Sequence, residues 1–186
     1  MKAGDFCALL NTHIKKLYPI VIVDTDPTKF TYRDCSENGC PLTQLSNQTQ
    51  NPIIPIGNLV GSWWRVLVPI EPNSQGFQIA NVRKVSDDCS RATIVQYASE
   101  RCIQKEVPTY WILNDFQPLC RPLANSVWTD GRRDRVIAIE GAPIICHEIE
   151  SGRIFQYQRS AFYLQHKEKP IEHLSPIKNL QRCLAS

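Results

Sequence analysis

Two cysteines flank a short acidic stretch in the first quarter of the chain. Cys35 and Cys40 lie in the sequence DCSENGCP, with four residues between them. A structural zinc site needs four Cys or His ligands, usually as two close pairs, and a redox couple usually has C-x-x-C spacing. The other cysteines and the four histidines supply no second close pair. We therefore interpret the stretch as an Asn38-Gly39 turn. No cofactor or metal is expected, and Cys35 and Cys40 are only weak metal candidates.

The dipeptide Cys146-His147 combines a nucleophile with a base. Both residues lie in the predicted strand 144–149, where neighbouring side chains point to opposite faces. His147 is therefore badly placed to activate Cys146, and a buried thiol beside a surface imidazole is the plainer interpretation. A cysteine-dependent enzyme with Cys146 or Cys35 as its nucleophile remains an alternative function.

An aromatic pair flanked by arginines occurs in the predicted strand 154–158. Alternation with period two places Arg153, Phe155, Tyr157 and Arg159 on one face. Such a face can stack nucleic-acid bases or hold a cation. The alternative is that Phe155 and Tyr157 face the core, as in any half-buried antiparallel strand.

A second candidate surface lies in the sequence WWRVLVPI at residues 63–70. Trp64 and Val66 belong to a purely apolar face, which we expect in the core. Trp63 and Arg65 share the other face, and these two residue types are enriched at binding hot spots. If the sheet is covered on both sides, both tryptophans are core residues instead.

Three arginines cluster on a predicted turn. Arg132, Arg133 and Arg135 occur in the sequence DGRRDR, interleaved with Asp130 and Asp134. The forked guanidinium group suits recognition of phosphate or carboxylate. The two aspartates weaken the local field, so ion pairs within the loop are the alternative.

The elements that must position these residues are mostly strands. Runs rich in β-branched and aromatic residues, bounded by Pro, Gly, Asn and Asp, predict strands at 19–23, 30–32, 63–70, 77–85, 91–97, 110–113, 135–140, 144–149 and 154–158. Their spacing is typical of an antiparallel meander, a small barrel or a sandwich. The segment Cys40 to Pro55 is polar and bounded by prolines, which predicts a long loop. The fold class is therefore mainly β.

Short helices are predicted at the two ends of the chain. Apolar residues recur at helical spacing from Phe6 to Leu17, with Asp5 as a possible N-cap, and again from Leu174 to Leu184. The chain fits one domain, 1–186, with possible sub-units 1–60 and 61–165 and a helical tail 166–186. A weak echo relates residues 19–32 to residues 143–157, and we attribute it to chance.

Composition limits the compartment and the partner. The longest apolar run is far shorter than a membrane span, and the N-terminus lacks the apolar core of a secretory signal. We therefore expect a cytoplasmic protein, with no membrane contact, whose eight cysteines are free thiols. The net charge of +3 neither requires nor excludes nucleic acid.

The expected function is that of a non-catalytic interaction module. No phosphate-binding loop, zinc-protease motif or nucleophile elbow occurs in the sequence. We expect a subunit or accessory factor of a larger protein or nucleoprotein assembly, which binds through its aromatic and arginine faces. Because the net charge is small, a protein partner ranks above nucleic acid. A zinc-stabilised nucleic-acid-binding module is a further alternative, and the sequence does not indicate the oligomeric state.

Overall fold

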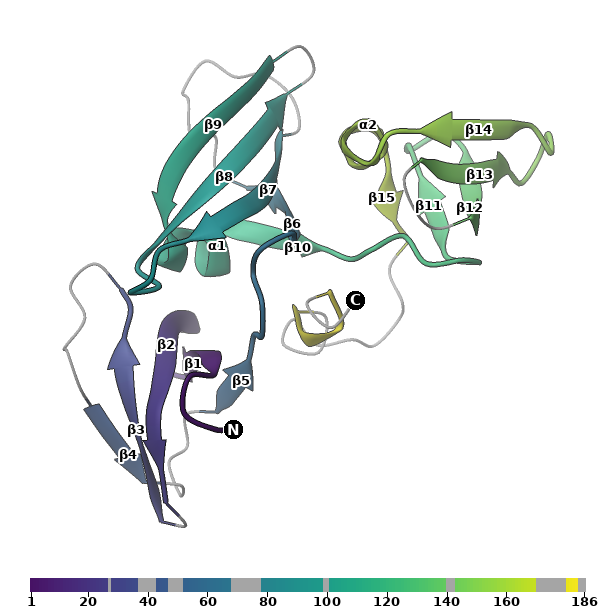
Figure 1. Ribbon diagram of the computed structural model, residues 1–186. Helices are drawn as coiled ribbons and strands as arrows, with labels where there is room; N and C mark the ends of the chain where they lie inside the picture. The colour runs from purple at the N-terminus through teal and green to yellow at the C-terminus, as the bar shows by residue number, and fades with distance from the viewer. Residues whose placement is uncertain are drawn as a thin grey trace.

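The computed structural model describes residues 1–26, 28–36, 43–46, 52–67, 78–98, 101–139, 143–169 and 180–183. Its strands form three antiparallel sheets of five strands each, which Figure 1 shows as three separate bodies along the chain. The predicted mainly β fold is therefore confirmed. Within the described residues, none of the three sheets closes into a barrel.

The first sheet has the strand order β4-β3-β2-β1-β5. Its strands are β1 (Phe6–Asn11), β2 (Lys16–Thr25), β3 (Lys29–Asp34), β4 (Thr43–Ser46) and β5 (Ile53–Pro55). The second sheet has the order β10-β6-β7-β8-β9. Its strands are β6 (Trp63–Val66), β7 (Gln78–Val85), β8 (Arg91–Ala98), β9 (Arg101–Pro108) and β10 (Phe116–Leu119).

The third sheet has the order β14-β13-β12-β11-β15. Its strands are β11 (Val127–Thr129), β12 (Asp134–Ile139), β13 (Ile144–Glu148), β14 (Ile154–Tyr157) and β15 (Lys167–Glu168). Two short helices, α1 (Thr109–Asp115) and α2 (Arg159–Gln165), each connect the fourth strand of a sheet to its fifth. Residues 180–183 form one further helical turn.

All three sheets have the same topology, a four-strand meander whose fifth strand pairs with the first. They also share a register shift between the second and third strands, at Ile22/Asp24, Val82/Lys84 and Ile137/Ile139. A β-bulge that recurs at one position is a built-in feature of a fold. We therefore describe the chain as three repeats, at residues 1–57, 58–120 and 121–169.

Each repeat begins with the same backbone turn. A residue with positive φ donates its N–H to a carbonyl of the second strand at 2.8 Å, in the pairs Gly4–Ile22, Gly61–Val82 and Asn125–Ile137. Left-handed backbone is easy for Gly and tolerated by Asn, which explains the residue types. The turn places the first strand of each repeat beside the second strand of the same repeat.

A buried tryptophan anchors the first strand of the second repeat. The indole Nε1 of Trp64 donates to Ser62 Oγ at 2.7 Å, and that hydroxyl donates to the Leu59 carbonyl. The same relay connects three residues of the third repeat: Trp128, Ser126 and Leu123. The relay satisfies an indole N–H that burial would otherwise leave unpaired. In the first repeat the buried Cys7 occupies the tryptophan position, as its pairing with β2 indicates.

Neighbouring repeats share their apolar cores. Ala8 and Ile54 of the first repeat belong to the same buried cluster as Trp64 and Ile112 of the second. The Asn114 side chain of α1 joins the two repeats further, since it exchanges two hydrogen bonds of 2.8 Å with the backbone of Leu17. The third repeat forms a separate cluster, which also includes Ile79 of β7.

Three local predictions were wrong. The predicted N-terminal helix is the hairpin of β1 and β2, because the Asn11 side chain accepts two backbone N–H bonds and Lys15 takes a positive φ, which reverses the chain. The predicted strand 110–113 is helix α1, which buries Ile112 and Leu113. The predicted loop 40–55 contains β4 and β5. Of the predicted C-terminal helix, only residues 180–183 are described.

The repeated turn gives a test of the fold. We expect Gly61→Ala to lower the free energy of unfolding by about 1–2 kcal/mol, because an alanine at φ +89° is strained although space for its Cβ is open. Gly61→Asn should cost clearly less, since Asn125 holds the equivalent position. Urea unfolding followed by tryptophan fluorescence measures both variants. An alanine variant as stable as the asparagine variant would contradict the equivalence of the turns.

Candidate functional site

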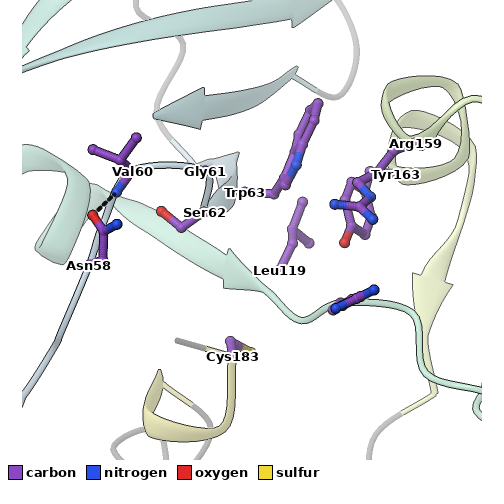
Figure 2. Close-up of a pocket in the computed structure, with 10 residues that line it drawn as sticks. Asn58, Val60, Gly61, Ser62, Trp63, Leu119, Arg159, Tyr163 and Cys183 are labelled. Atoms are coloured by element: carbon purple, nitrogen blue, oxygen red, sulfur yellow. Dashed lines mark hydrogen bonds between the residues drawn. The ribbon is translucent and has the colours of Figure 1, made fainter. Parts of the chain in front are cut away.

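A pocket of about 250 Å³ lies where the second repeat, the third repeat and the C-terminal turn meet. Figure 2 shows Trp63, Leu119, Tyr163 and Arg159 gathered around it, with Cys183 on the opposite side. Among the described residues, the pocket is lined by Asn58, Val60, Gly61, Ser62, Trp63, Leu119, Arg121, Arg159, Tyr163 and Cys183. These lining residues come from four separate segments of the described chain.

Aromatic rings hold one wall of the pocket. The Trp63 ring stacks on Tyr97 with 5.5 Å between centroids and 29° between planes, and it meets Tyr163 at the same centroid distance. Trp63 is half-buried, and its strand position faces directly across to Leu119 of β10. The sequence prediction that Trp63 faces away from the core residue Trp64 agrees with this geometry.

Two arginines line the pocket. Arg121 and Arg159 line it together with Tyr163, and among the described residues no acidic side chain does so. Both arginines act electrostatically on the Tyr163 hydroxyl, but burial dominates and raises the pKa of that group. The hydroxyl donates to the Cys120 carbonyl at 2.8 Å, which fixes the ring at the base of the pocket.

The C-terminal turn is fastened to the edge of the pocket. Cys183 forms a disulfide with Cys120, which directly follows β10. Arg182 pairs with Glu168 of β15 at 2.6 Å, and Leu180 is buried in the core shared by the first two repeats. The prediction that all cysteines are free thiols was therefore wrong for Cys120 and Cys183. Their sequence separation gave no sign that the two chain segments meet.

Arg65 joins the second repeat to the third. Its side chain is only 8% exposed, and Nη2 donates to the carbonyls of His166 at 3.3 Å and Tyr163 at 3.5 Å. Burial lowers the pKa of its guanidinium. Arg65 does lie on the same face as Trp63, as the alternation predicted. That face meets the third repeat, so the Arg65 side chain is a contact between repeats and not an exposed surface group.

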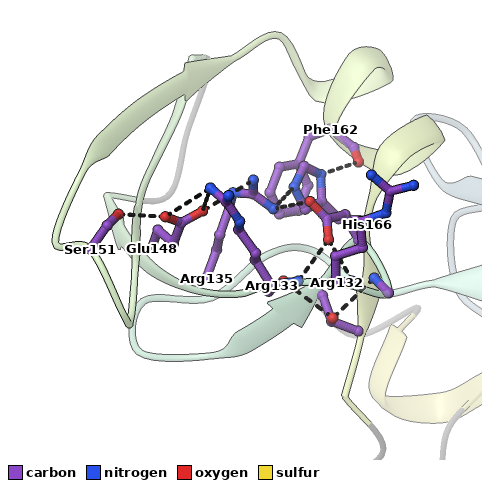
Figure 3. A network of polar contacts seen from close by, with 10 residues as sticks. Arg132, Arg133, Arg135, Glu148, Ser151, Phe162 and His166 are labelled. Atoms are coloured by element: carbon purple, nitrogen blue, oxygen red, sulfur yellow. Dashed lines mark hydrogen bonds and ion pairs between the residues drawn. The ribbon is translucent and has the colours of Figure 1, made fainter.

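In the predicted arginine cluster at residues 130–135, Arg133 and Arg135 bind acidic side chains of the same chain in a polar network, shown in Figure 3. Arg135 is buried, and its Nη1 lies 2.7 Å from Asp130 Oδ2 and 2.9 Å from His166 Nε2. Its guanidinium also lies over the Phe155 ring, 5.0 Å from the centroid. The hydrogen bond from Arg135 holds the pKa of the Asp130 carboxyl well below its usual range. These contacts compensate a charge that would otherwise be costly to bury.

Glu148 completes the network from the neighbouring strand. Its carboxylate accepts from Arg133 Nη1 at 3.1 Å and from the Ser151 hydroxyl, and both contacts lower its pKa. Arg133 remains half-exposed beside it. The Arg132 side chain is exposed, and its backbone N–H donates to Asp130 Oδ1 at 2.8 Å. Of the three predicted arginines, Arg132 is thus the one that faces solvent most freely.

His166 sits in the network as a neutral imidazole. The Phe162 carbonyl, 3.1 Å from Nδ1, can only accept, so Nδ1 carries the proton and Nε2 accepts from Arg135. The ring stacks on Phe162 with 4.5 Å between centroids. Burial is the main cause that lowers the pKa of His166, and nearby Arg135 adds to it.

The predicted aromatic face of residues 153–159 is divided by the structure. Phe155 and Tyr157 lie on β14 and pack against the core of the third repeat, which is the alternative that the sequence left open. Arg153 is exposed before the strand begins. Strand β14 ends at Tyr157 and Arg159 opens helix α2, so Arg159 joins the pocket and does not continue the strand face. The sequence pattern failed here because a helix begins two residues after the strand.

The cysteine candidates are buried. Cys146 is fully buried on β13, where it and His147 point to opposite faces as predicted, and burial raises its pKa. Cys35 is also buried, and its pKa is raised. Cys40 lies outside the described residues. Among the described residues no group of three or more Cys, His, Asp or Glu side chains is arranged to hold a metal ion.

Sequence reasoning missed Asn58, Arg121 and Tyr163 in the pocket and Glu148 and His166 in the network. Arg159 and Tyr163 are four residues apart, so a helical interpretation of residues 159–165 would have placed both on one face. Arg121 and Asn58 carried no such signal, because only strand pairing brings them together.

No family model matches the chain, and no curated protein matches its sequence. Among the described residues, no helix has the length and apolar character needed to cross a membrane. The functional argument therefore rests on the geometry above.

Removing the Arg65 side chain should loosen the third repeat. We expect Arg65→Met to lower the free energy of unfolding by about 2 kcal/mol, because two carbonyls lose a charged hydrogen-bond donor. Hydrogen exchange should also quicken in α2. Arg132→Met is the matched control, since the Arg132 side chain is exposed. Equal exchange rates in the two variants would contradict the role of Arg65.

The neutral state of His166 predicts lower stability in acid. Because burial lowers its folded pKa below the unfolded value near 6.5, the unfolded chain binds more protons below that pH. The urea midpoint should therefore fall as the pH drops from about 7 toward 5. His166→Gln should flatten this dependence, whereas His147→Gln, at a half-exposed position, should not. A slope unchanged in His166→Gln would refute the assignment.

Proposed function

We propose that the protein is a non-catalytic interaction module that holds an acidic segment of a protein partner in the pocket between its second and third repeats. It would act as a subunit or accessory factor of a larger assembly. The observation that carries this proposal is the combination of Trp63, Arg121 and Arg159 around one cavity.

The size of the pocket favours one side chain or chain terminus as its occupant. Cofactors and drug-sized ligands usually occupy about 300–1,000 Å³, whereas this cavity measures about 250 Å³. Its position between repeats is one where binding sites are common. A macromolecular partner that inserts a single group and rests on the surrounding surface fits this size.

The charge of the pocket favours an anionic group. Guanidinium groups recognise carboxylate and phosphate through paired, charge-assisted hydrogen bonds. Trp63 adds an aromatic surface of the type that dominates protein hot spots. An aspartate, a glutamate, a phosphorylated side chain or a C-terminal carboxylate of a protein would meet both features.

The positions of the other candidate binding residues favour a protein partner over nucleic acid. Phe155 and Tyr157 pack inward, and Arg133 and Arg135 bind acidic side chains of their own chain. Fewer aromatic and arginine groups are therefore presented for stacking on bases and neutralising phosphates. A cysteine-dependent enzyme is less well supported, because Cys146 is fully buried and its pKa is raised.

The cytoplasm is the proposed compartment. Five of the seven described cysteines, Cys7, Cys35, Cys89, Cys102 and Cys146, are free thiols. Free thiols on both buried and exposed positions are typical of a reducing compartment. The Cys120–Cys183 disulfide is the one observation against this proposal among the described cysteines, because disulfides are rare in a reducing compartment.

Charge reversal in the pocket tests the proposal. Arg121→Glu with Arg159→Glu should reduce retention of protein partners from native lysate, and of acidic or phosphorylated peptides on an array, at least about tenfold. Arg101→Glu with Arg132→Glu changes the net charge equally at exposed positions outside the pocket and should have little effect. Urea unfolding of both double variants verifies their stability.

Two readouts separate the partner classes. Retention on heparin and binding of a single-stranded DNA probe across salt concentrations report phosphate-driven association. Loss of peptide binding in the pocket variant alone, with little salt-dependent DNA binding, supports the proposal. Equal retention of partners by both double variants, or strong salt-dependent DNA binding with no peptide binding, would refute it.

A further inference from the structure

Two thiols from different repeats meet at the junction of the first and second repeats. Cys35 directly follows β3, and Cys89 lies in the turn between β7 and β8. The two thiols lie close enough for a side-chain interaction that shifts the pKa of both. Figure 1 shows the β7–β8 turn beside the end of β3, which agrees with this contact.

The two thiols have different access to solvent. Cys35 is 2% exposed, its amide donates to the Pro19 carbonyl at 2.8 Å, and its Sγ lies 3.6 Å from the Arg33 carbonyl. Cys89 is partly exposed in a turn, where it takes a φ of +60°. A left-handed conformation is uncommon for cysteine, and such outliers concentrate at functional positions. Cys89 is therefore the more accessible of the two residues.

The turn that presents Cys89 is well ordered by its own contacts. The Asp88 carboxylate accepts from the Ser86 hydroxyl at 2.6 Å and the Ser90 hydroxyl at 2.8 Å. The Ser90 carbonyl accepts from the Thr109 amide at the start of α1. These contacts fix the turn that carries Cys89 within the second repeat.

We propose that Cys35 and Cys89 form a redox-active pair, in which Cys89 reduces a small hydroperoxide and Cys35 then closes a disulfide between the first two repeats. The pair would be a modification site, independent of the pocket between the second and third repeats.

The reaction balances with hydrogen peroxide as the oxidant. The Cys89 thiolate attacks one peroxide oxygen, the O–O bond breaks, and the departing hydroxide takes a proton to give water and a Cys89 sulfenic acid. The Cys35 sulfur then attacks the Cys89 sulfur, the S–O bond breaks, and the hydroxide leaves with the Cys35 proton as a second water. Two electrons pass from the two thiols to the peroxide.

Local electrostatics favour Cys89 as the attacking thiol. The hydrogen bond from Cys35 is the largest cause that lowers the pKa of Cys89 to about 7, and Arg33 lowers it further. Asp87 and Asp88 act in the opposite direction. The same hydrogen bond raises the pKa of Cys35, so Cys35 keeps its proton while Cys89 is a thiolate. Attacker and resolving thiol are therefore distinguished before any oxidant arrives.

Alkylation kinetics test the first step. At pH 7 about half of Cys89 is thiolate, against about one in a hundred for a thiol of pKa 9.0, but each thiolate is about eightfold less nucleophilic. Iodoacetamide should therefore label Cys89 about sixfold faster than such a thiol, and Cys102, an exposed free cysteine on β9, is the reference within the chain. Cys35→Ala should slow Cys89 toward the Cys102 rate, because the hydrogen bond is lost. Cys102 serves as the internal reference for folding of each variant.

Peptide mapping tests the second step. Trypsin with a glutamate-specific protease releases Cys35 in residues 34–37, apart from Cys40, and Cys89 in residues 85–91. After treatment of the full chain with hydrogen peroxide, these two peptides should appear linked and return to free thiols with dithiothreitol. In Cys35→Ala, dimedone should trap the Cys89 sulfenic acid instead. Labelling of Cys89 no faster than Cys102, or peroxide treatment without the linked peptide, would overturn the proposal.

Discussion

The return of the last strand of a repeat onto its first strand is the constraint on which the rest of the structure depends. In the second repeat, β10 pairs with β6 and sets Leu119 directly opposite Trp63. The chain therefore leaves the repeat beside the point where it entered. Asn58, Arg121 and Cys120 are brought to one place by this pairing, and the pocket and the disulfide to Cys183 both form there. Without the pairing, Asn58 would not lie beside Cys120 and Arg121.

The three repeats pair their strands in the same register, but equivalent positions hold side chains of different chemical types. The position of Ala80 in the second repeat corresponds to Arg135 in the third, since each lies opposite the buried tryptophan of its first strand. Arg135 is compensated by Asp130 and His166, so the third repeat buries a polar network where the second buries apolar side chains. Burying a charge is costly unless it is paired, and this explains why Arg135 is buried together with Asp130 and His166 as partners. Arg121 and Arg159 lie outside this network and line the pocket between the second and third repeats.

Strand periodicity was a good guide to the fold and a poor one to the site. β-branched runs between turn residues located most strands of the second and third repeats, and the separation of Trp63 from Trp64 followed from alternation alone. The echo between residues 19–32 and 143–157 paired the second and third strands of one repeat with the third and fourth of another, so attributing it to chance was sound. The true repeat lies in the short turns before each first strand, where only Gly or Asn, a small hydrogen-bonding residue and, in two cases, Trp recur. A signal of three or four residues is too short to stand out in one sequence.

The stretch DCSENGCP illustrates which features the sequence alone predicts and which features depend on the tertiary structure. By itself the sequence determined a mainly β chain, the faces of its regular strands and the absence of a cysteine spacing suited to zinc or a C-x-x-C couple. Which cysteine approaches Cys35 was decided by the packing of the β7–β8 turn against the end of β3, and Cys89 lies too far along the chain for any local pattern to reveal it. The same holds for Arg65, Arg159 and Tyr163. Local periodicity is encoded by neighbours in sequence, whereas contacts between repeats depend on how complete sheets dock, and no short window contains that information.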